Sequence, residues 1–364
     1  MISVIGAGPA GAYTSYLLAK QGYDVKLFEE HTTIGSPIQC TGILTEGIFK
    51  FFKPKKETIA NTISRIKIHS QNEEVELKLK KKEIIVNRTE FDRSIADMAH
   101  DAGTEVLTGH RFLEKQGKNI IIQNVKNLEK KQFSPSYLIG ADGPNSQVAK
   151  SAGMKGKRKF FYGAQATIKG NFDPDCYEVY LGSICPDLFA WVVPEDTKHA
   201  RAGLASYAHP HKYFQAFLKK LGSPVVCECQ GGLIPLYNKS IETEKSNTFL
   251  VGDAAFQVKA STAGGIIQGL TAAKAAEQAI IQEQSYEKLW KKSLQKDLQI
   301  HLLIRKMMNR FSDKDYDYLL KLVKQERIKH ILEKHERDYP SKFVMALAIK
   351  EPRFAYFARF LLGI

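Results

Sequence analysis

The stretch Ile2-Ser3-Val4-Ile5-Gly6-Ala7-Gly8-Pro9-Ala10-Gly11, close to the start of this 364-residue chain, decides its fold. The apolar run Ile2–Ile5 predicts a buried β-strand. A helix is expected from about Pro9 to Gln21, ended by Gly22 as a C-cap glycine would end it. Residues 23–28 then read as a second strand. The sequence therefore predicts a strand–helix–strand unit with a glycine-rich turn after its first strand.

The three glycines of this turn have the spacing of a dinucleotide-binding motif. Gly6 permits the tight turn, Gly8 lets the backbone approach a pyrophosphate, and Gly11 lets the helix pack close to the strand. The helix N-terminus presents free N–H groups to the phosphates. Glu29 follows Gly11 by 18 residues, close to the spacing of a carboxylate that binds ribose hydroxyls, although Glu30 is adjacent. We expect a nucleotide here; a purely structural turn is the alternative.

Two later motifs indicate which dinucleotide binds. Phe249-Leu250-Val251-Gly252-Asp253-Ala254-Ala255 is followed by Gly264-Gly265-Ile266, which opens a helix running to about Gln282. Asp253 can hold a ribityl hydroxyl, and the positive end of that helix can face the electron-rich pyrimidine of a flavin. Between the first and these motifs stands Ile139-Gly140-Ala141-Asp142-Gly143-Pro144-Asn145-Ser146, whose Asp-Gly turn closes a strand. A nicotinamide cofactor needs neither element, so we predict FAD.

The three motifs in this order resemble the flavin-dependent superfamily that includes para-hydroxybenzoate hydroxylase. Two further segments, Gly35-Ser36-Pro37-Ile38-Gln39-Cys40-Thr41-Gly42 and Pro186-Asp187-Leu188-Phe189-Ala190-Trp191-Val192-Val193-Pro194, look like the geranylgeranyl reductase family within it. Phe189 and Val193 replace a Tyr and a Phe of that family's pattern. The resemblance implies an α/β protein with a Rossmann-like FAD-binding domain, an antiparallel β-sheet substrate domain and a helical C-terminal region.

The resemblance also implies a domain layout and a set of site residues. We expect a discontinuous FAD-binding domain (1–60, 87–155 and 243–284), a substrate-binding β-sheet domain (61–86 and 156–242) and a helical C-terminal region (285–364). The residues expected to bind FAD non-covalently are Gly6, Gly8, Ala10, Gly11, Glu29, Cys40, Thr41, Ile43, Arg88, Phe112, Asp253, Gly265 and Ile266. Those expected to bind substrate are Phe189, Trp191 and Pro194, with Cys40 and Trp191 as catalytic candidates.

A purely structural role remains an alternative for several of these residues. Cys40 can be a small buried hydrophobe, Trp191 can be plain core, and Arg88 can be a surface arginine before a helix that we expect from Phe91 to Ala102. The other four cysteines and the ten histidines show no metal-ligand spacing, so no metal site is expected.

The activity implied by the resemblance is saturation of carbon–carbon double bonds in geranylgeranyl or other isoprenoid chains of membrane lipids or prenyl diphosphates. Electrons would come from NAD(P)H or from a ferredoxin-like donor protein, because the chain has only one dinucleotide turn. Two alternatives remain open. One is an aromatic or polyketide monooxygenase, and the other is a flavoprotein that carries or senses lipids without turnover.

The charge and the hydropathy of the chain limit the kinds of partner that it can have. The net charge is +14, and residues 285–364 hold 18 Lys and Arg against 10 Asp and Glu. A solvated helical surface explains such a surplus, and so does contact with an anionic membrane. Apolar residues 354, 357, 360 and 361 would form an interfacial helix or pack onto the body. No nucleic-acid motif and no apolar run of about 18 residues is found. We expect a cytoplasmic protein, peripheral on the cytoplasmic face of the membrane.

Overall fold

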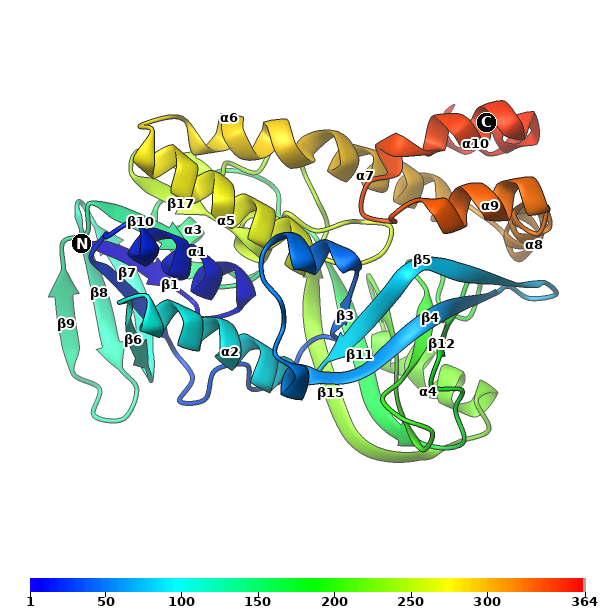
Figure 1. The fold of residues 1–364 in the computed structure, drawn as a ribbon, viewed down its shortest axis with the longest axis horizontal. Coiled ribbons are helices and arrows are strands. Elements are labelled where there is room, and N and C mark those ends of the chain that lie inside the picture. The colour runs from blue at the N-terminus through cyan, green and yellow to red at the C-terminus, as the bar shows by residue number, and fades with distance from the viewer. Residues whose placement is uncertain (363–364) are drawn as a thin grey trace.

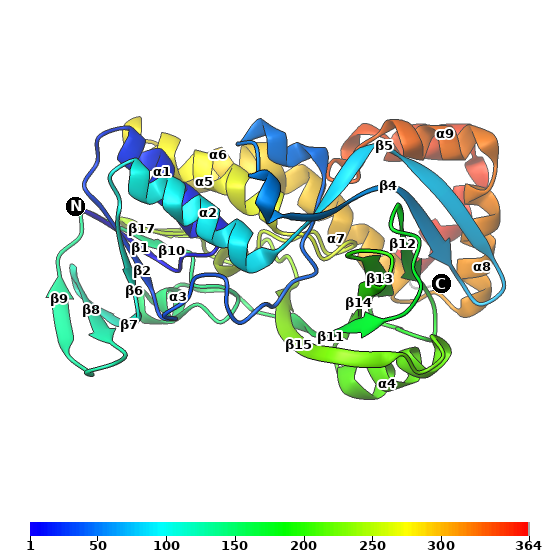
Figure 2. The ribbon, with the colours of Figure 1, turned by 60° about the horizontal axis from the view of Figure 1, so that its bottom comes forward.

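The computed structural model describes residues 1–362, which build two large sheets, one small sheet and a helical C-terminal region (Figure 1). The parallel sheet with its helices occupies one end of the molecule. The long hairpin of β4 (Ile59–His69) and β5 (Glu74–Val86) occupies the other end. The C-terminal helices run along one side of both (Figures 1 and 2). The α/β class with a parallel sheet, a second sheet and a helical C-terminal region is as predicted; the last two residues of 285–364 lie outside the described residues.

The first large sheet has six strands in the order β16-β17-β10-β1-β2-β6. Its strands are β1 (Ile2–Ile5), β2 (Val25–Glu29), β6 (Glu105–Thr108), β10 (Tyr137–Gly140), β16 (Glu244–Lys245) and β17 (Thr248–Leu250). All pairs are parallel except β16–β17. Because the neighbours of β1 come from distant parts of the chain, the carboxyl ends of β1, β2, β10 and β17 meet at one edge, where ligands of open α/β sheets bind.

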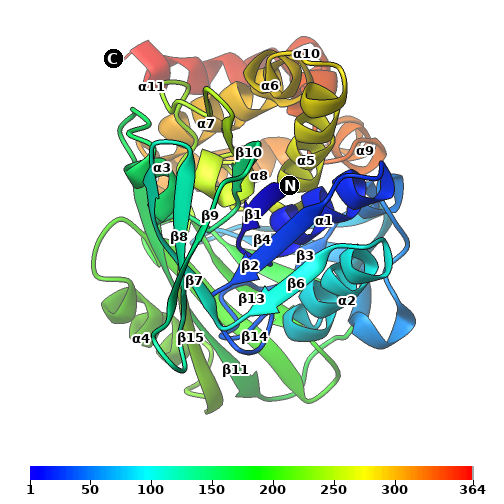
Figure 3. The same cartoon turned by 90° about the vertical axis from the view of Figure 1, so that its left-hand side faces the viewer.

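Both faces of this sheet are covered. Helices α1 (Pro9–Lys20), α2 (Arg88–Asp101) and α5 (Ile266–Ile281) pack on the face of Ile2 and Val4. The face of Ile5 packs against α3 (Gln147–Ser151) and a three-stranded sheet of β7 (His110–Gln116), β8 (Asn119–Asn124) and β9 (Lys130–Phe133). Figure 3 shows these layers on either side of β1 and β2. Alternate side chains of one strand therefore pack into two cores, which explains why all four residues of β1 are buried.

Two local expectations need correction. The helix expected from Phe91 begins at Arg88, because the side chain of Asn87 accepts hydrogen bonds from the amides of residues 89 and 90 and caps it. The run 106–113, which reads as one strand, is divided at Gly109, whose φ is +67°. β6 before this corner belongs to the parallel sheet and β7 after it to the small sheet. Alternation of apolar residues continues through the corner and so does not reveal it.

The second large sheet has eight strands in the order β15-β11-β14-β13-β12-β4-β5-β3. Its strands are β3 (Ile43–Leu44), β4 (Ile59–His69), β5 (Glu74–Val86), β11 (Phe160–Lys169), β12 (Cys176–Tyr180), β13 (Ala190–Pro194), β14 (His199–Ser206) and β15 (Val225–Pro235). Every pair is antiparallel except β4–β12. Helix α4 (Pro210–Lys220) buries Phe214 and Phe217 against the outer face. The opposite face of this sheet, its inner face, is the one that a ligand can contact.

The C-terminal region closes the inner face from the other side. It comprises α6 (Tyr286–Trp290), a π-helical turn (Lys291–Gln295), α7 (Lys296–Met308), α8 (Asp313–Val323), α9 (Glu326–Lys334), α10 (Val344–Lys350) and α11 (Arg359–Leu362), with 3₁₀ turns at Pro340–Lys342 and Pro352–Ala358. Helices α8 and α9 contact β5. Phe357 is buried and its ring lies 4.9 Å from that of Phe311, so this side chain packs within the C-terminal region. Among the described residues, no helix is long and apolar enough to cross a bilayer.

Candidate active site

A cavity of about 1110 Å³ is lined by both large sheets and by the C-terminal helices. At one end lie the glycine-rich turn and Glu29, and in the middle lie residues 39–43 and 263–266. At the far end lie Ile66 and Ile68 of β4 with Leu320 and Val323 of α8. One continuous space therefore connects the predicted nucleotide turn to an apolar chamber.

The nucleotide end is organised by the turn itself. Gly6 has φ of +98°, and a side-chain carbon at Gly11 would lie 2.0 Å from the carbonyl oxygen of Gly6. Gly11 therefore serves the packing of α1 on the turn and does not line the cavity. Gly8 and Ala10 do line it. The Glu29 carboxylate accepts a hydrogen bond from the amide of Ala7 at 2.8 Å, which holds the acid beside the turn.

The neighbouring acid points elsewhere. Glu30 pairs with Arg111 at 2.9 Å, and both side chains are about half exposed. Both acids line the cavity, but only Glu29 is tied to the glycine-rich turn. Phe112, which follows Arg111 on β7, is buried and lines the same end. These positions suit an adenosine group.

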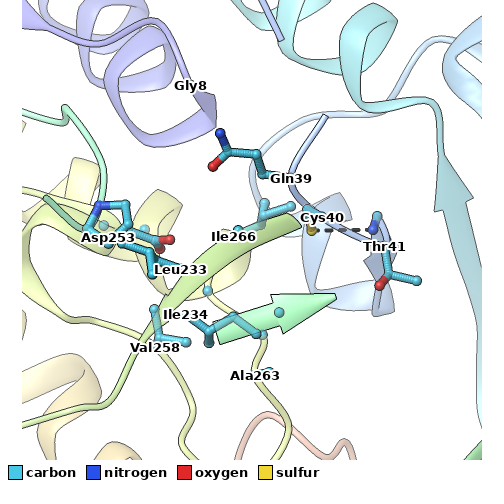
Figure 4. Close-up of a pocket in the computed structure, with 18 of the residues that line it drawn as sticks. Gly8, Gln39, Cys40, Thr41, Leu233, Ile234, Asp253, Val258, Ala263 and Ile266 are labelled. Carbon is cyan, nitrogen blue, oxygen red and sulfur yellow. Dashed lines mark hydrogen bonds between the residues drawn. The ribbon is translucent and has the colours of Figure 1, made fainter. Parts of the chain in front are cut away.

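Asp253 and the start of α5 lie at the middle of the cavity, with Cys40 opposite them (Figure 4). Asp253 belongs to a 3₁₀ turn, Gly252–Ala255, and burial raises the pKa of its carboxyl to about 6, against the opposing effect of Arg88. Gly265 is the N-cap of α5, and a side-chain carbon there would lie 2.9 Å from Asp253 Oδ1. The amide end of α5 thus meets a carboxyl group at a point where only glycine fits.

Arg88 is not a surface arginine. Its Nε and Nη2 donate to the two oxygens of Asp92 at 3.0 and 2.7 Å, and both side chains are largely buried. Burial raises the pKa of the Asp92 carboxyl, while Arg88 opposes that rise. Arg88 also lines the cavity, so the paired guanidinium can meet a ligand on its remaining side.

The segment from Gly35 to Ile43 crosses the middle of the cavity. Cys40 Sγ accepts a hydrogen bond from the amide of Gly42 at 3.3 Å. Arg201 Nη1 donates to the carbonyl oxygen of Thr41 at 2.6 Å, and Thr41 Oγ1 donates to Gln165 Oε1 at 2.6 Å. Cys40 and Thr41 line the cavity (Figure 4), and Ile43 lines it as well. Hydrogen bonds to β11 and β14 of the second large sheet therefore fix the position of this segment.

The predicted substrate residues are only partly brought together. Phe189 and Trp191 line the cavity with their rings 5.8 Å apart in an edge-to-face arrangement. Pro194 does not line it; Pro194 ends β13, and its carbonyl oxygen accepts a hydrogen bond from Asn61 at 2.9 Å. Phe189 and Trp191 are therefore placed to contact a substrate, whereas Pro194 ends the strand that carries them.

Sequence analysis missed several polar residues of the cavity wall. These are Gln165, Tyr177, Lys259, Arg305, Arg337 and Asp338. Arg305 is fully buried and donates to the carbonyl oxygens of Asp187 and Leu188, directly before Phe189. From the sequence, a basic residue on an amphipathic helix is expected to face solvent, so no local pattern reveals that Arg305 is buried.

The middle of the cavity fits an FAD. Gln268 Oε1 and Thr262 Oγ1 are buried, line the cavity and make no hydrogen bond within the described part of the chain. A side-chain carbon at Gly8 would meet no atom within 4 Å, which leaves room at the turn for a close backbone approach. Buried polar atoms normally have partners, and flavin and phosphate groups supply them.

Comparison with known proteins agrees with this geometry. A family model described as "FAD binding domain" matches residues 1–175. The digeranylgeranylglycerophospholipid reductase of Methanosarcina acetivorans is 28% identical, over 89% of this chain and 88% of the relative. Digeranylgeranylglycerophospholipid reductase 2 of Methanothermobacter thermautotrophicus is 29% identical, over 93% and 97%.

Solved structures extend the comparison. The crystal structure of a geranylgeranyl bacteriochlorophyll reductase-like protein from Thermoplasma acidophilum has a TM-score of 0.86 and 25% identity, over 96% of both chains. A flavin-dependent brominase has a TM-score of 0.74 at 15% identity, which shows a shared fold alone. The flavin motifs and the aromatic wall thus agree with these comparisons: the first 175 residues match an FAD-binding domain, and nearly the whole chain is similar to proteins named as reductases of geranylgeranyl groups.

Proposed function

We propose that this protein is an FAD-dependent reductase that saturates carbon–carbon double bonds in the geranylgeranyl chains of a glycerophospholipid. The observation that carries the proposal is the continuity of the cavity, which joins the flavin-binding segments to an apolar chamber. The named activity of the relatives, reduction of a digeranylgeranylglycerophospholipid, requires such a connection.

The flavin end of the cavity would bind and polarise the cofactor. Gly8 and the start of α1 would hold the pyrophosphate, Glu29 the ribose and Asp253 the ribityl chain. The amide end of α5 at Gly265 would stabilise negative charge on the pyrimidine. When bound and reduced, FAD supplies a hydride, and the residues around it need only orient the ring toward the chamber.

The apolar end would position the lipid chain and exclude water. Val179 of β12 and Leu181, directly after that strand, lie beside Ile66 and Ile68 of β4, and Leu320 of α8 packs in the same cluster. An isolated double bond carries no carbonyl group to polarise, so alignment in a dry chamber is the main contribution that the protein can make. Phe189 and Trp191 would form the wall where the chain meets the ring.

Mass spectrometry of the lipid product tests this function directly. Reduced protein is incubated anaerobically with a digeranylgeranylglycerophospholipid, and a gain of hydrogen pairs with simultaneous flavin oxidation is expected. Oxygen consumption stimulated by the substrate would favour the monooxygenase, and lipid binding without any change in flavin absorbance would favour a lipid carrier. The same assay with NAD(P)H or a reduced ferredoxin as the only reductant identifies the electron donor, which we propose to bind transiently.

We further propose that the protein meets the membrane through α10. Met345 and Ile349, four residues apart on that helix, are 72% and 70% exposed, and the exposed Lys342 and Lys350 flank them. Apolar side chains beside lysines suit the surface of an anionic bilayer. The double variant M345S/I349S is expected to bind anionic vesicles several-fold more weakly. The matched control V225S/V226S changes exposed valines on β15; an equal loss in both variants would refute this surface.

A further inference from the structure

Alkene reduction needs a proton as well as a hydride, and the cavity wall holds an unassigned group of ionisable side chains. Tyr177, Arg337, Asp338 and Lys259 all line the cavity, and Glu83 lies behind them. A charged cluster in the wall of an apolar chamber is costly to bury, which makes it a candidate for chemistry.

Tyr177 occupies the inner face of the second sheet next to the aromatic wall. On β12, Tyr177 pairs with Ile66 of β4, and Val179 pairs with Ile68 on one side and with Trp191 on the other. Side chains two residues apart on a strand share a face, so the Tyr177 ring is one step along β12 from the row that holds Trp191. Both residues line the cavity.

The hydroxyl of Tyr177 is arranged as a donor. Arg337 Nη1 donates to Tyr177 Oη at 2.5 Å, which uses a lone pair of that oxygen and leaves its own proton available. Burial raises the pKa of the Tyr177 hydroxyl, while Arg337 opposes that rise. The phenol is therefore neutral around pH 7, and the guanidinium is placed to stabilise the phenolate that forms when the proton leaves.

Arg337 is held in this position by Glu83, and the residue that follows Arg337 is a second buried acid. Its Nη2 lies 2.7 Å from Glu83 Oε2, at an angle that makes an ion pair without a hydrogen bond. The next residue, Asp338, is fully buried, pairs with Lys259 and accepts a hydrogen bond from Thr45 Oγ1. Burial acts to raise the pKa of Asp338, but Lys259 and Thr45 lower it to about 2, so Asp338 stays ionised and cannot itself be the donor.

Lys259 places the cluster close to the flavin-binding segment. Its amide donates to the carbonyl oxygen of Gly264, and its Cε would lie 2.9 Å from a side-chain carbon at Gly264. Gly264 directly precedes the N-cap of α5. The cluster thus stands between the flavin-binding loop and the lipid chamber, where the two reaction partners of the proposed function meet.

We propose that Tyr177 is the catalytic acid of this site and that Arg337 is its positioning residue. The inference rests on the proposed reductase function. Reduced FAD, when bound, would supply a hydride to one alkene carbon, and Tyr177 would give its hydroxyl proton to the other, so that two new C–H bonds replace the π bond. The flavin is oxidised, the alkene is reduced, and the Tyr177 phenolate regains a proton from water when the saturated lipid leaves. The external donor then reduces the flavin again.

Single-turnover kinetics of Tyr177→Phe test this assignment. Protein is reduced anaerobically, mixed with the unsaturated lipid, and flavin oxidation is followed by absorbance, with FAD content and lipid affinity measured separately. A rate at least about 100-fold lower is expected, since general acids contribute about 10²–10⁴-fold. FAD content and lipid affinity are expected to stay near wild type. Retention of the rate within threefold would overturn the assignment, whatever the rate of Cys40→Ser.

Two further arms keep the test decisive. Tyr180→Phe is the matched control, because that hydroxyl donates to Glu178 and does not line the main cavity; its rate is expected to be unchanged. If Tyr177→Phe does not fold, Tyr177→3-fluorotyrosine keeps the ring and hydroxyl but makes a stronger acid; a several-fold faster rate supports the proposal, and an unchanged rate refutes it. Failure of wild-type protein to reduce any lipid in this assay would refute the proposed function itself.

Discussion

Gln165 Oε1 accepts a hydrogen bond from the indole Nε1 of Trp191 at 3.0 Å. The same oxygen accepts from Thr41 Oγ1, so one amide connects the aromatic wall of the lipid chamber to the segment beside the flavin. Gln165 Nε2 donates to Gln230 Oε1 at 2.6 Å, which fixes the orientation of the amide. The ring of Trp191 is therefore positioned relative to Thr41 by hydrogen bonds and not by packing alone.

Replacing Gln165 by Leu should disturb the aromatic wall without removing the cofactor. The variant leaves the buried Trp191 donor and the partly buried Thr41 donor without their acceptor, which costs about 1–3 kcal/mol of folding free energy. We expect a lower rate of lipid reduction and altered Trp fluorescence, with FAD content unchanged. Gln230→Leu removes only the outer partner and should have a smaller effect. Identical kinetics in Gln165→Leu and wild type would contradict the positioning role.

The glycines of the first turn should separate stability from cofactor binding. Gly11→Ala places a methyl group 2.0 Å from the carbonyl oxygen of Gly6, so it should destabilise the fold by about 3 kcal/mol or more. Gly8→Ala meets no atom within 4 Å and should fold normally. Since Gly8 lines the cavity, its methyl group should weaken FAD binding at least tenfold. Thermal melts and flavin absorbance measure the two effects; normal FAD content in Gly8→Ala would place the pyrophosphate elsewhere.

Asp253 predicts a specific pH dependence of stability in FAD-stripped protein. Burial raises the folded pKa of its carboxyl from 3.8 to about 6, against the effect of Arg88. The folded state then binds more protons than the unfolded state, so this contribution is complete below pH 3.8 and is lost as the pH rises through 6. The loss amounts to about 3 kcal/mol at most.

Asp253→Asn should therefore raise the melting temperature of FAD-stripped protein at pH 8 and leave it nearly unchanged at pH 4. The same variant should bind FAD more weakly, because a neutral amide is a poorer acceptor for a ribityl hydroxyl. Calorimetry at both pH values provides the measurement. An equal shift at pH 4 and pH 8 would mean that the buried charge is not the cause.

The Arg88–Asp92 pair should be costly to break from one side. Arg88→Met leaves the Asp92 carboxyl buried without its bidentate partner, which should lower the free energy of unfolding by about 3–5 kcal/mol. The double variant R88M/D92L removes both charges and should recover part of that loss. Urea unfolding compares the three proteins. A single variant no less stable than the double variant would show that solvent reaches Asp92.

Several parts of the site could be predicted because their chemistry is local in the chain. The glycine turn, Glu29 and the Gly265 end of α5 depend on backbone geometry over a few residues, and a phosphate or flavin requires that geometry wherever it occurs. The aromatic segment with Phe189 and Trp191 was also evident. Pro194, three residues further, ends β13 and does not line the cavity.

The residues that no local pattern could reveal are joined across the chain. Gln165 lies 26 residues from Trp191 and 124 from Thr41, and Tyr177 lies 160 residues from Arg337. Each reads in isolation as an ordinary strand or helix residue. Their roles depend on the strand register within the second large sheet and on the C-terminal region, which folds back over that sheet.

From the amino-acid order alone followed the fold class and the motifs that predict FAD, because turns, caps and helix ends are specified by neighbouring residues. The tertiary structure decided which polar groups face the lipid chamber and which helix surface is left exposed. The physical reason is that burial and pairing are properties of contacts between distant segments. A buried tyrosine beside an arginine acquires chemistry that neither residue has in the unfolded chain.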